Sequence, residues 1–376
     1  MFKKVLILSA SAGAGHVRAA QAIERAFLEM HAAEEVRHID ALEYTTKIFK
    51  NIASKAYLDL VNKAPLLLGW FYELTDKPWK SERLRLAIDM LNTQPLVKMI
   101  KQYQPDIMVC THFTPADIIS WLKERNAIHS PHAIVVTDFD VHASWLCRHF
   151  EHYFVAIEES RVHLEKLGIP AHKMTVSGIP IDPVFATHKD KKAMREKYGL
   201  EPDRTTILVS AGGFGVGPVE NLLASLLETK HQAQIVAICG KSEELKGRLE
   251  NVAAHNPHKR RVSINVVGYT TAMDEYMAAA DILVGKTGGL TTSEALARGL
   301  IIVVVNPIPG QEERNADHLL EEGAAIRCNN LPAIAYKIDR LLDNPSRINA
   351  MKKNIRRLAR PRAAYDIVSK LINLKA

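Results

Sequence analysis

Short apolar runs alternate with stretches of helical periodicity along most of this chain. In the first half, strand-like runs occupy residues 4–8, 36–39, 107–110, 133–136 and 153–157. After the first run, residues 16–30 show the three- and four-residue spacing of an amphipathic helix, with apolar side chains at Val17, Ala20, Ile23 and Phe27. Short buried strands that alternate with helices predict a parallel β-sheet covered by helices.

The same alternation restarts in the second half of the chain. Residues 188–197 are polar and charged, and apolar runs then begin near residues 206, 234, 263, 281, 301 and 324. We therefore predict an α/β fold with two doubly wound, Rossmann-like domains of similar size that face a cleft. The predicted boundaries are 1–185 for the first domain, 186–357 for the second, and 358–376 for a C-terminal helix. Pro361 separates this helix from the basic amphipathic pattern before it.

Composition narrows the choice of partners and compartment. With 376 residues, of which 47% are hydrophobic, the chain can bury two cores of ordinary domain size. Its net charge of +7 suits an anionic partner, such as a phospholipid surface or a nucleotide. The cysteines have no CxxC or metal-ligand spacing, which favours a reduced, cytoplasmic protein. Because neither a signal peptide nor an apolar run of about 18 residues appears, any membrane contact is expected to be peripheral.

Two segments of the second half carry the strongest candidate chemistry. Residues 285–289, Gly-Lys-Thr-Gly-Gly, follow an apolar run and open a helical pattern. Paired glycines at such a turn let backbone N–H groups approach a phosphate, and the helix dipole favours an anion there. Residues 309–315 follow another buried run and bring amide and carboxylate side chains to the same crevice. We predict a nucleotide-sugar site, with the diphosphate near Lys286, Gly288 and Gly289 and the sugar hydroxyls near Gln311 and Glu312.

His16 is the main candidate for catalysis in the first half. It lies where residues 13–15, Gly-Ala-Gly, meet the first helical pattern, at the expected C-terminal edge of the first strand. An imidazole with a pKa of roughly 6.5 suits a base that accepts a proton from an acceptor hydroxyl, and a helix-capping role is the alternative. Arg18 occupies the position of the third glycine in a dinucleotide-binding fingerprint. Ile235 occupies the position of the first glycine in a P-loop that would include Lys241. A dehydrogenase and a P-loop NTPase are therefore disfavoured.

A second cluster follows the apolar run at residues 133–136. Asp138 occupies the same kind of position as His16, so its carboxylate could orient the imidazole, hold the acceptor hydroxyl or act as the base itself. His142 and Trp145 lie in the same loop and could form an acceptor pocket, while helix capping is the alternative for Asp138. Because no further metal-ligand pattern accompanies Asp138 and Asp140, we expect no metal cofactor.

Residues 44–85 mix aromatic and basic side chains. This mixture suits an interfacial segment on anionic lipid, and a helical hairpin with solvated lysines is the alternative. No nucleic-acid-binding module is apparent, so no nucleic acid partner is expected. The predicted membrane contacts are Trp70, Phe71, Lys77, Lys80, Arg83 and Arg85.

Eight motifs occur in one order along nearly the whole chain. They are Gly13-Ala14-Gly15-His16, Thr137-Asp138-Phe139, Gly178-Ile179-Pro180, residues 212–218, Cys239-Gly240-Lys241, Gly268-Tyr269, and the segments 285–289 and 309–315. This order resembles the monogalactosyldiacylglycerol synthase and processive diacylglycerol glucosyltransferase family, which is related to the peptidoglycan lipid N-acetylglucosaminyltransferase.

The resemblance implies a GT-B fold whose last helix crosses back onto the first domain. It also implies metal-independent, inverting transfer of a hexose from UDP-glucose or UDP-galactose to diacylglycerol. In this family, the residue matching Glu294 accepts ribose hydroxyls, the main chain at Gly268 and Tyr269 reads uracil, and the residue matching His16 is the base or positions the acceptor. Other implied acceptor contacts are Gly15, His142 and Trp145; other implied donor contacts are Gly213, Gly215, Cys239, Gly240, Lys241, Pro309 and Asn315.

We therefore predict a peripheral enzyme that makes glycolipid on the cytoplasmic face of the cell membrane. The enzymatic alternatives are transfer of N-acetylglucosamine to a polyprenyl-linked lipid and epimerisation of a UDP-sugar on the same fold. A non-catalytic nucleotide-sugar sensor is disfavoured, because the chain retains His16, Asp138, Glu294 and Gln311.

Overall fold

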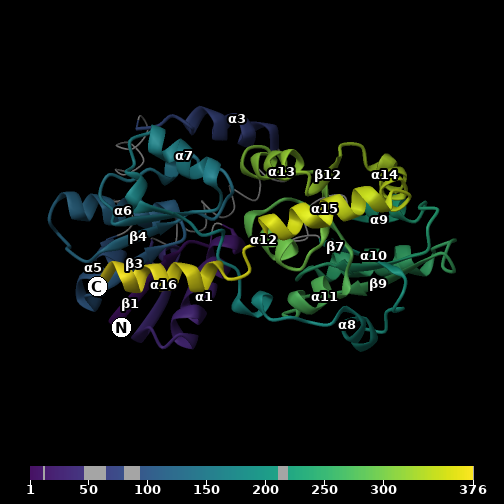
Figure 1. Cartoon of the computed structure of the whole chain (residues 1–376), viewed down its shortest axis with the longest axis horizontal. Coiled ribbons are helices and arrows are strands. Elements are labelled where there is room, and N and C mark those ends of the chain that lie inside the picture. The colour runs from purple at the N-terminus through teal and green to yellow at the C-terminus, as the bar shows by residue number, and fades with distance from the viewer. Residues whose placement is uncertain (12, 46–64, 80–93, 211–218, 376) are drawn as a thin grey trace.

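The computed structural model of the chain describes residues 1–11, 13–45, 65–79, 94–210 and 219–375. These residues form two α/β domains that lie side by side along the long axis of the molecule (Figure 1). Each domain contains a six-stranded sheet in which the strands are parallel. The prediction of two doubly wound α/β domains is confirmed.

The sheet of the first domain has the strand order β2-β1-β3-β4-β5-β6. Because β1 pairs with β2 on one side and with β3 on the other, the chain order reverses beside the carboxyl end of β1. The strands are β1 (Phe2–Ser9), β2 (Ala33–Asp40), β3 (Ile107–Cys110), β4 (His132–Val135), β5 (His152–Val155) and β6 (Met174–Val176).

The sheet of the second domain has the order β12-β11-β10-β7-β8-β9, which reverses between β7 and β10. Its central strands are buried apolar runs, as expected for a parallel sheet covered on both faces. The strands are β7 (Thr205–Ser210), β8 (Ala233–Ile238), β9 (Val262–Val267), β10 (Ile282–Gly285), β11 (Ile301–Val305) and β12 (Ala325–Cys328).

Helices cover the sheets and supply the connections between strands. Before residue 190 they are α1 (Ala14–Glu29), η1 (Ala41–Tyr44), α3 (Pro65–Thr75), α5 (Gln94–Tyr103), α6 (Phe113–Glu124), η2 (Ala143–Trp145), α7 (Glu158–Lys166), η3 (Ala171–Lys173) and η4 (Pro183–Ala186). After it they are α8 (Lys191–Lys197), α9 (Val219–Leu226), α10 (Glu243–Ala254), α11 (Met273–Ala279), α12 (Gly289–Ala297), α13 (Gln311–Glu321), η5 (Leu331–Ala333), α14 (Ile334–Leu342), α15 (Pro345–Leu358) and α16 (Ala363–Lys375).

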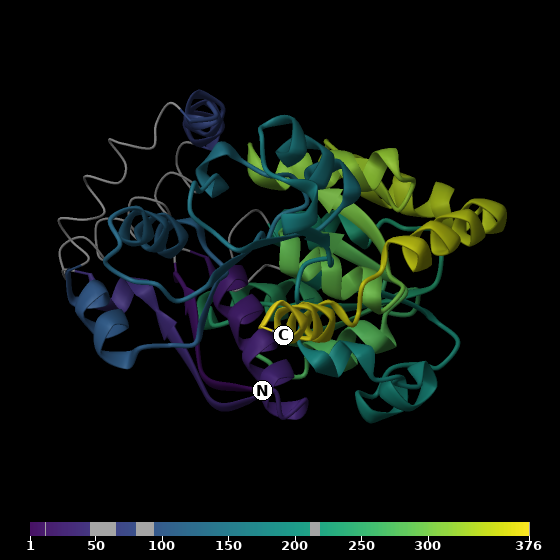
Figure 2. The ribbon, with the colours of Figure 1, turned by 60° about the vertical axis from the view of Figure 1, so that its left-hand side comes forward.

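Helix α16 ends the chain but packs on the first domain. It runs beside α1, and both views show this arrangement (Figures 1 and 2). Ile367 and Leu371 are fully buried in the same cluster as Ile23 and Phe27 of α1. The crossing is tight: Gly178 has φ +81°, and a Cβ added there would lie 2.5 Å from the Cβ of Arg360. Glycine is therefore required where this connection passes.

One strand was missed by the sequence prediction. Strand β6 was not predicted, because its three residues, Met-Thr-Val, form no apolar run and two of them are only partly buried. Between residues 44 and 104, the described part of the chain contains the helices α3 and α5.

Candidate active site

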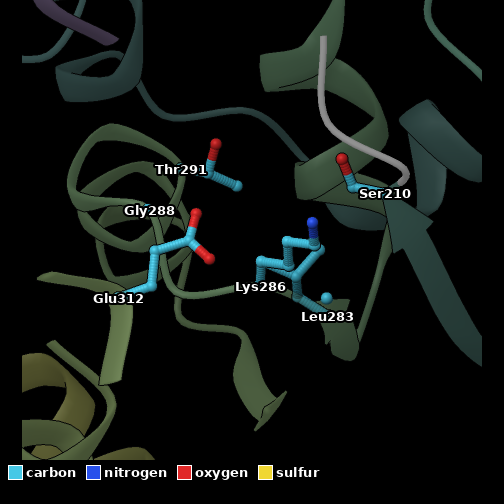
Figure 3. Close-up of a pocket in the computed structure, with 7 residues that line it drawn as sticks. Ser210, Leu283, Lys286, Gly288, Thr291 and Glu312 are labelled. Atoms are coloured by element: carbon cyan, nitrogen blue, oxygen red, sulfur yellow. The ribbon is translucent and has the colours of Figure 1, made fainter. Parts of the chain in front are cut away.

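A cavity lies where the chain order of the second sheet reverses, which is the usual place for a ligand in such folds. Its volume of about 100 Å³ is smaller than the roughly 300 Å³ typical of a whole small-molecule site. Its walls come from the carboxyl ends of β7 and β10 and from α12 and α13. The lining residues are Ser210, Leu283, Gly285, Lys286, Gly288, Thr291 and Glu312 (Figure 3).

The cavity has a positive wall. Helix α12 begins at Gly289 with Gly288 as its N-cap, so the unpaired N–H groups and the positive end of the helix dipole lie beside the cavity. The amine of Lys286 lies between Ser210 and Glu312 (Figure 3). Burial lowers the pKa of Lys286, while the charge of Glu312 opposes this shift. This arrangement can hold a diphosphate.

Glu312 is held in place at the start of α13. Its Oε2 accepts a hydrogen bond of 2.7 Å from the Ile308 backbone N–H, and the Thr287 hydroxyl donates to its carbonyl at 2.6 Å. Burial raises the pKa of the carboxyl group to about 7, against the hydrogen bond from Ile308 and the charge of Lys286. Gln311 is the first residue of α13 and is partly exposed, immediately after Pro309 and Gly310. Of the two predicted sugar-binding residues, Glu312 thus lines the cavity and Gln311 precedes it at the start of α13.

Glu294 lies on α12 but has an unexpected partner. Its side chain is 1% exposed, and Oε1 accepts a hydrogen bond from Arg18 on α1 of the first domain. Burial raises the pKa of Glu294 to about 7, although the charge of Arg18 lowers it. Glu294, the residue predicted to bind the ribose, therefore lies where the two domains contact each other.

The other predicted donor residues follow β8 and β9. Cys239 is buried, Gly240 has φ +64°, and the ammonium group of Lys241 lies 5.2 Å from the ring centroid of Tyr269. Tyr269, which follows Gly268, is 63% exposed. Gly213 and Gly215 lie outside the described residues.

His16 is oriented through one ring nitrogen. Its Nδ1 lies 3.0 Å from the Thr111 carbonyl oxygen and 2.8 Å from the Thr137 hydroxyl. A carbonyl only accepts hydrogen bonds, so the bond to Thr111 places the proton on Nδ1 and the lone pair on Nε2. Burial lowers the pKa of His16 to about 4, which keeps the ring neutral at pH 7. The imidazole is thus prepared to accept a proton at Nε2.

Asp138 is linked to the second domain through Asn315. The Asn315 amide donates to Asp138 Oδ1 at 3.3 Å and to the Thr287 carbonyl at 3.0 Å, while its own oxygen accepts from the Phe139 N–H at 2.9 Å. Burial raises the pKa of Asp138 to about 6, against the hydrogen bond from Asn315. Asn315 therefore connects the loop that contains Asp138 to the turn at residues 285–289.

The predicted acceptor residues lie in the wall of the first domain. Trp145 is 2% exposed, with its ring centroid 6.4 Å from that of His16. His142 is also buried; its Nδ1 caps η2 by accepting from the Ser144 N–H, and its Nε2 lies 3.0 Å from the Tyr72 carbonyl. The residue that caps η2 is thus His142, not Asp138. Trp145 thus lies near His16 and His142 packs against Tyr72, and both rings are buried rather than forming an open surface.

Gly15 lies at the first turn of α1, where the two domains meet. A Cβ added there would lie 3.5 Å from Leu290 of α12, so the backbone of α1 approaches the donor domain closely.

Arg314 forms a cross-domain network that the sequence did not identify. Its Nη1 lies 2.7 Å from Asp140 and 2.8 Å from Asp76, and its Nη2 lies 2.9 Å from Glu73. The guanidinium also lies 5.1 Å from the ring centroid of Tyr72. The available signal was its position as the only cation in the 309–315 motif.

Within the described ranges, no group of three or more His, Cys, Asp or Glu side chains could hold a metal ion.

Helix α3 has one face on the donor domain and another in solvent. A Cβ added at Gly69 would lie 2.6 Å from the Cβ of Pro309. The helix therefore packs closely against residues 309–315, which include the residues predicted to bind the hexose. On the other face, Leu67, Trp70 and Leu74 are 59%, 64% and 43% exposed. Lys77 is exposed, whereas the side chain of Phe71 and all of Lys80, Arg83 and Arg85 lie outside the described structure. In the described part of the chain, no helix is long and apolar enough to cross a membrane.

Two family models match the two domains. Residues 16–181 match monogalactosyldiacylglycerol (MGDG) synthase, and residues 190–358 match glycosyl transferases group 1. The processive diacylglycerol beta-glucosyltransferase of Bacillus licheniformis is 32% identical over 370 residues, which cover 98% of this chain and 94% of the relative. The enzyme of the same name from Bacillus subtilis is 30% identical, over 95% of this chain and 91% of the relative.

Solved structures confirm the fold class. MurG of Acinetobacter baumannii matches with a TM-score of 0.63 and 17% identity, covering 99% of each chain. The UDP-GlcNAc 2-epimerase of Neisseria meningitidis, bound to UDP-GlcNAc, matches with a TM-score of 0.60 and 16% identity over 98% of this chain and all of the other. These likenesses establish a GT-B fold, and the full-length sequence matches establish the family. This chain belongs to the monogalactosyldiacylglycerol synthase family of glycosyltransferases, together with the processive diacylglycerol beta-glucosyltransferases.

Proposed function

We propose that this enzyme transfers glucose from UDP-glucose to diacylglycerol, with inversion at the anomeric carbon, at the cytoplasmic face of the cell membrane. The observation that carries the proposal is the match, over 98% of the chain, to a relative named for β-glucosyl transfer to diacylglycerol. Because glucose is α-linked in UDP-glucose, a single displacement that gives a β-linked product inverts the anomeric centre. The same name favours glucose over galactose.

The donor is proposed to lie along the crevice of the second domain. The cavity at Lys286 and the N-terminus of α12 binds the diphosphate, where fixed dipoles and one ammonium group stabilise the charge that develops on departing UDP. Gln311 and Glu312 bind hexose hydroxyls, and Glu294 binds the ribose. Uracil lies beside Gly268 and Tyr269, whose exposed ring is available for stacking.

His16 is proposed as the base that activates the acceptor. With Nδ1 bonded to the Thr111 carbonyl, its Nε2 lone pair accepts the proton of the diacylglycerol hydroxyl while that oxygen attacks the anomeric carbon. The low pKa makes His16 a weak base but keeps it neutral across the physiological range. Asp138, which is linked to the donor turn by Asn315, positions the acceptor.

The acidic limb of the rate profile distinguishes the two candidate bases. A base must be deprotonated, so activity should fall as pH drops through its pKa. The fall should come near pH 4 if His16 is the base and near pH 6 if Asp138 is. His16→Ala should keep UDP affinity and lower turnover by about a hundredfold or more. A limb near pH 6 that disappears in Asp138→Asn would transfer the role to Asp138.

Helix α3 is proposed as the membrane contact. Leu67, Trp70 and Leu74 recur at helical spacing and are exposed, and Lys77 follows them with a charge that suits anionic lipid. Each basic residue near an anionic surface contributes about 1 kcal/mol, screened over roughly 10 Å at 0.1 M salt. Binding should therefore have a salt-sensitive part and an apolar, salt-insensitive part.

Vesicle sedimentation tests this contact. Trp70→Glu should reduce binding to vesicles that contain phosphatidylglycerol at both low and high salt, whereas Lys77→Glu should reduce it only at low salt. Tyr336→Glu is the matched control, because Tyr336 is 61% exposed on α14 of the donor domain. If Trp70→Glu sediments as the wild type does, α3 is not the membrane surface.

The whole proposal is tested with radiolabelled UDP-sugars and vesicles that contain diacylglycerol. We expect label from UDP-glucose in a chloroform-soluble glycolipid, with β-linkage shown by NMR. Label from UDP-galactose alone would change the donor, and an α-linked product would exclude inversion. Conversion of the UDP-sugar without any lipid acceptor would point to an epimerase instead.

A further inference from the structure

Helix α1 of the first domain contacts the donor site through Arg18. Its guanidinium donates from Nη2 to Oε1 of Glu294, across the boundary between the domains. The Arg18 side chain is 41% exposed, whereas the Glu294 side chain is 1% exposed. Arg18 is thus the accessible member of an ion pair whose other member is enclosed.

Only one carboxylate oxygen of Glu294 is engaged in the described part of the chain. Oε1 accepts from Arg18, while Oε2 is buried and has no hydrogen-bond partner among those residues. A buried carboxylate oxygen without a donor is unfavourable, so this atom would gain a hydrogen bond from a hydroxyl group brought against it. Ribose presents two vicinal hydroxyls of this kind.

The pair lies where the domains are packed most closely. Beside it, Gly15 of α1 faces Leu290 of α12 at 3.5 Å, measured from the position of an added Cβ. One turn before Glu294, Gly289 packs against the Thr137 carbonyl so tightly that a Cβ there would lie 2.2 Å from the oxygen. The contact between Arg18 and Glu294 therefore joins the two domains beside close backbone approaches.

We propose that Arg18 is a positioning residue for the donor: it holds Glu294 ionised and oriented through Oε1, so that Oε2 accepts a ribose hydroxyl of the UDP-sugar. This inference rests on the proposed function, since the ribose contact of Glu294 belongs to that proposal. It adds that the acceptor domain supplies part of the donor site. Donor affinity then depends on domain closure as well as on the second domain itself.

The charges around Glu294 make the proposal measurable. Burial raises its pKa to about 7, Asp182 before η4 and Asp274 on α11 act in the same direction, and Arg18 on α1 acts against them. Loss of Arg18 should raise this pKa further. Because the ionised carboxylate binds the hydroxyl best, donor affinity should increase as pH rises through the pKa, and the midpoint should move to higher pH without Arg18.

The experiment is calorimetric titration with UDP-glucose between pH 6 and 9, where the phosphodiester groups of this ligand do not titrate. Arg18→Met should weaken binding at pH 7 by roughly tenfold, as for loss of support to a charged hydrogen bond. It should also move the midpoint up by about one pH unit or more, with recovery of affinity near pH 9. Arg18→Lys, which keeps the charge, should fall between the two.

Two controls separate this role from mere packing. Glu294→Gln removes the titration of Glu294 and leaves that of Glu312, whose pKa is also raised to about 7, so adding Arg18→Met to it should cause no further midpoint shift. Arg161→Met removes an arginine from α7 that pairs with Glu158 and Glu165, and it should bind as the wild type does. An equal loss of affinity at every pH in Arg18→Met, without rescue by lysine, would overturn the proposal.

Failure of the proposed function gives a different pattern. If Glu294→Gln binds UDP-glucose as tightly as the wild type at every pH, the ribose assignment is wrong. If the wild type does not bind UDP-glucose, the donor itself is wrong. A midpoint shift caused by Arg18→Met and absent in the Glu294→Gln background supports both.

Discussion

Replacement of Gly289 by alanine tests whether the two domains meet in solution as closely as they do in the structure. The added Cβ would lie 2.2 Å from the Thr137 carbonyl oxygen and 3.0 Å from Cδ1 of Ile179. Since real Cβ contacts essentially never fall below 3.0 Å, α12 and the Thr137 loop would have to separate by at least 0.8 Å. The obstructing atom belongs to the backbone, so no side-chain rotation relieves the clash.

The expected cost follows from this geometry. Overpacking of this kind destabilises by about 1–3 kcal/mol, and each kcal/mol lowers Tm by about 2–4 °C in domains of 150–250 residues. The same shift displaces Thr137, whose hydroxyl lies 2.8 Å from Nδ1 of His16. A misplacement of about 1 Å at a catalytic group can lower turnover on the order of a hundredfold. We therefore expect a lower Tm and a much larger loss of glucosyl transfer.

Differential scanning calorimetry and lipid glucosylation on diacylglycerol vesicles measure the two effects. Gly247→Ala is the matched control, because a Cβ at this position in α10 meets no atom within 4 Å; it should raise stability by about 0.5–1 kcal/mol and leave turnover unchanged. If Gly289→Ala has the Tm and turnover of the wild type, α12 and the Thr137 loop are not in contact in solution, and the reasoning is refuted.

Three further predictions concern α13 and its contacts. Arg314→Met removes the partner of Asp76 and Asp140 and should lower stability by about 1–3 kcal/mol in urea unfolding; an unchanged midpoint would show that the network is solvated. Burial raises the pKa of Glu312 to about 7, so the folded state binds its proton more tightly and the contribution of Glu312 to stability should fall as pH rises from 5 to 8; Glu312→Gln should remove this contribution, and a pH profile of stability identical to that of the wild type would contradict this. Gly310→Ala should cost about 1–3 kcal/mol in thermal unfolding, because φ is +93° with ψ −114° and the added Cβ would lie 2.7 Å from Cγ of Tyr72; an unchanged Tm would contradict this.

The fold was predictable because the buried strands and amphipathic helices of a parallel α/β fold have recognisable local patterns of apolar residues. Buried runs such as residues 107–110 are apolar throughout, and the helices between them carry clear apolar stripes. Strand β6 escaped because it has three residues at the edge of its sheet, where pairing to β5 rather than burial defines it. The local sequence does not show which strand a segment pairs with.

The positions of the candidate site residues were predictable for a related reason. His16, Asp138 and Lys286 follow strands, and parallel strands present their carboxyl ends at one edge. The pairings across the cleft were not: Arg18 and Glu294 are 276 residues apart, and Arg314 and Asp140 are 174 apart. Such contacts depend on how two separate domains are placed. The sequence identified Arg18 only as a residue that breaks a dinucleotide fingerprint.

The packing of α16 on α1 sets the order in which the protein can fold on the ribosome. The first domain emerges first, but the apolar layer over its sheet is completed by Ile367, Val368 and Leu371, near the end of the chain. At 5–20 residues per second, synthesis from residue 185 to residue 376 takes roughly 10–40 s. Throughout that interval, Ile23 and Phe27 lack their final cover. The nascent first domain should therefore be a client for chaperones that recognise exposed apolar helices, while residues 186–358 can fold without waiting for the C-terminus.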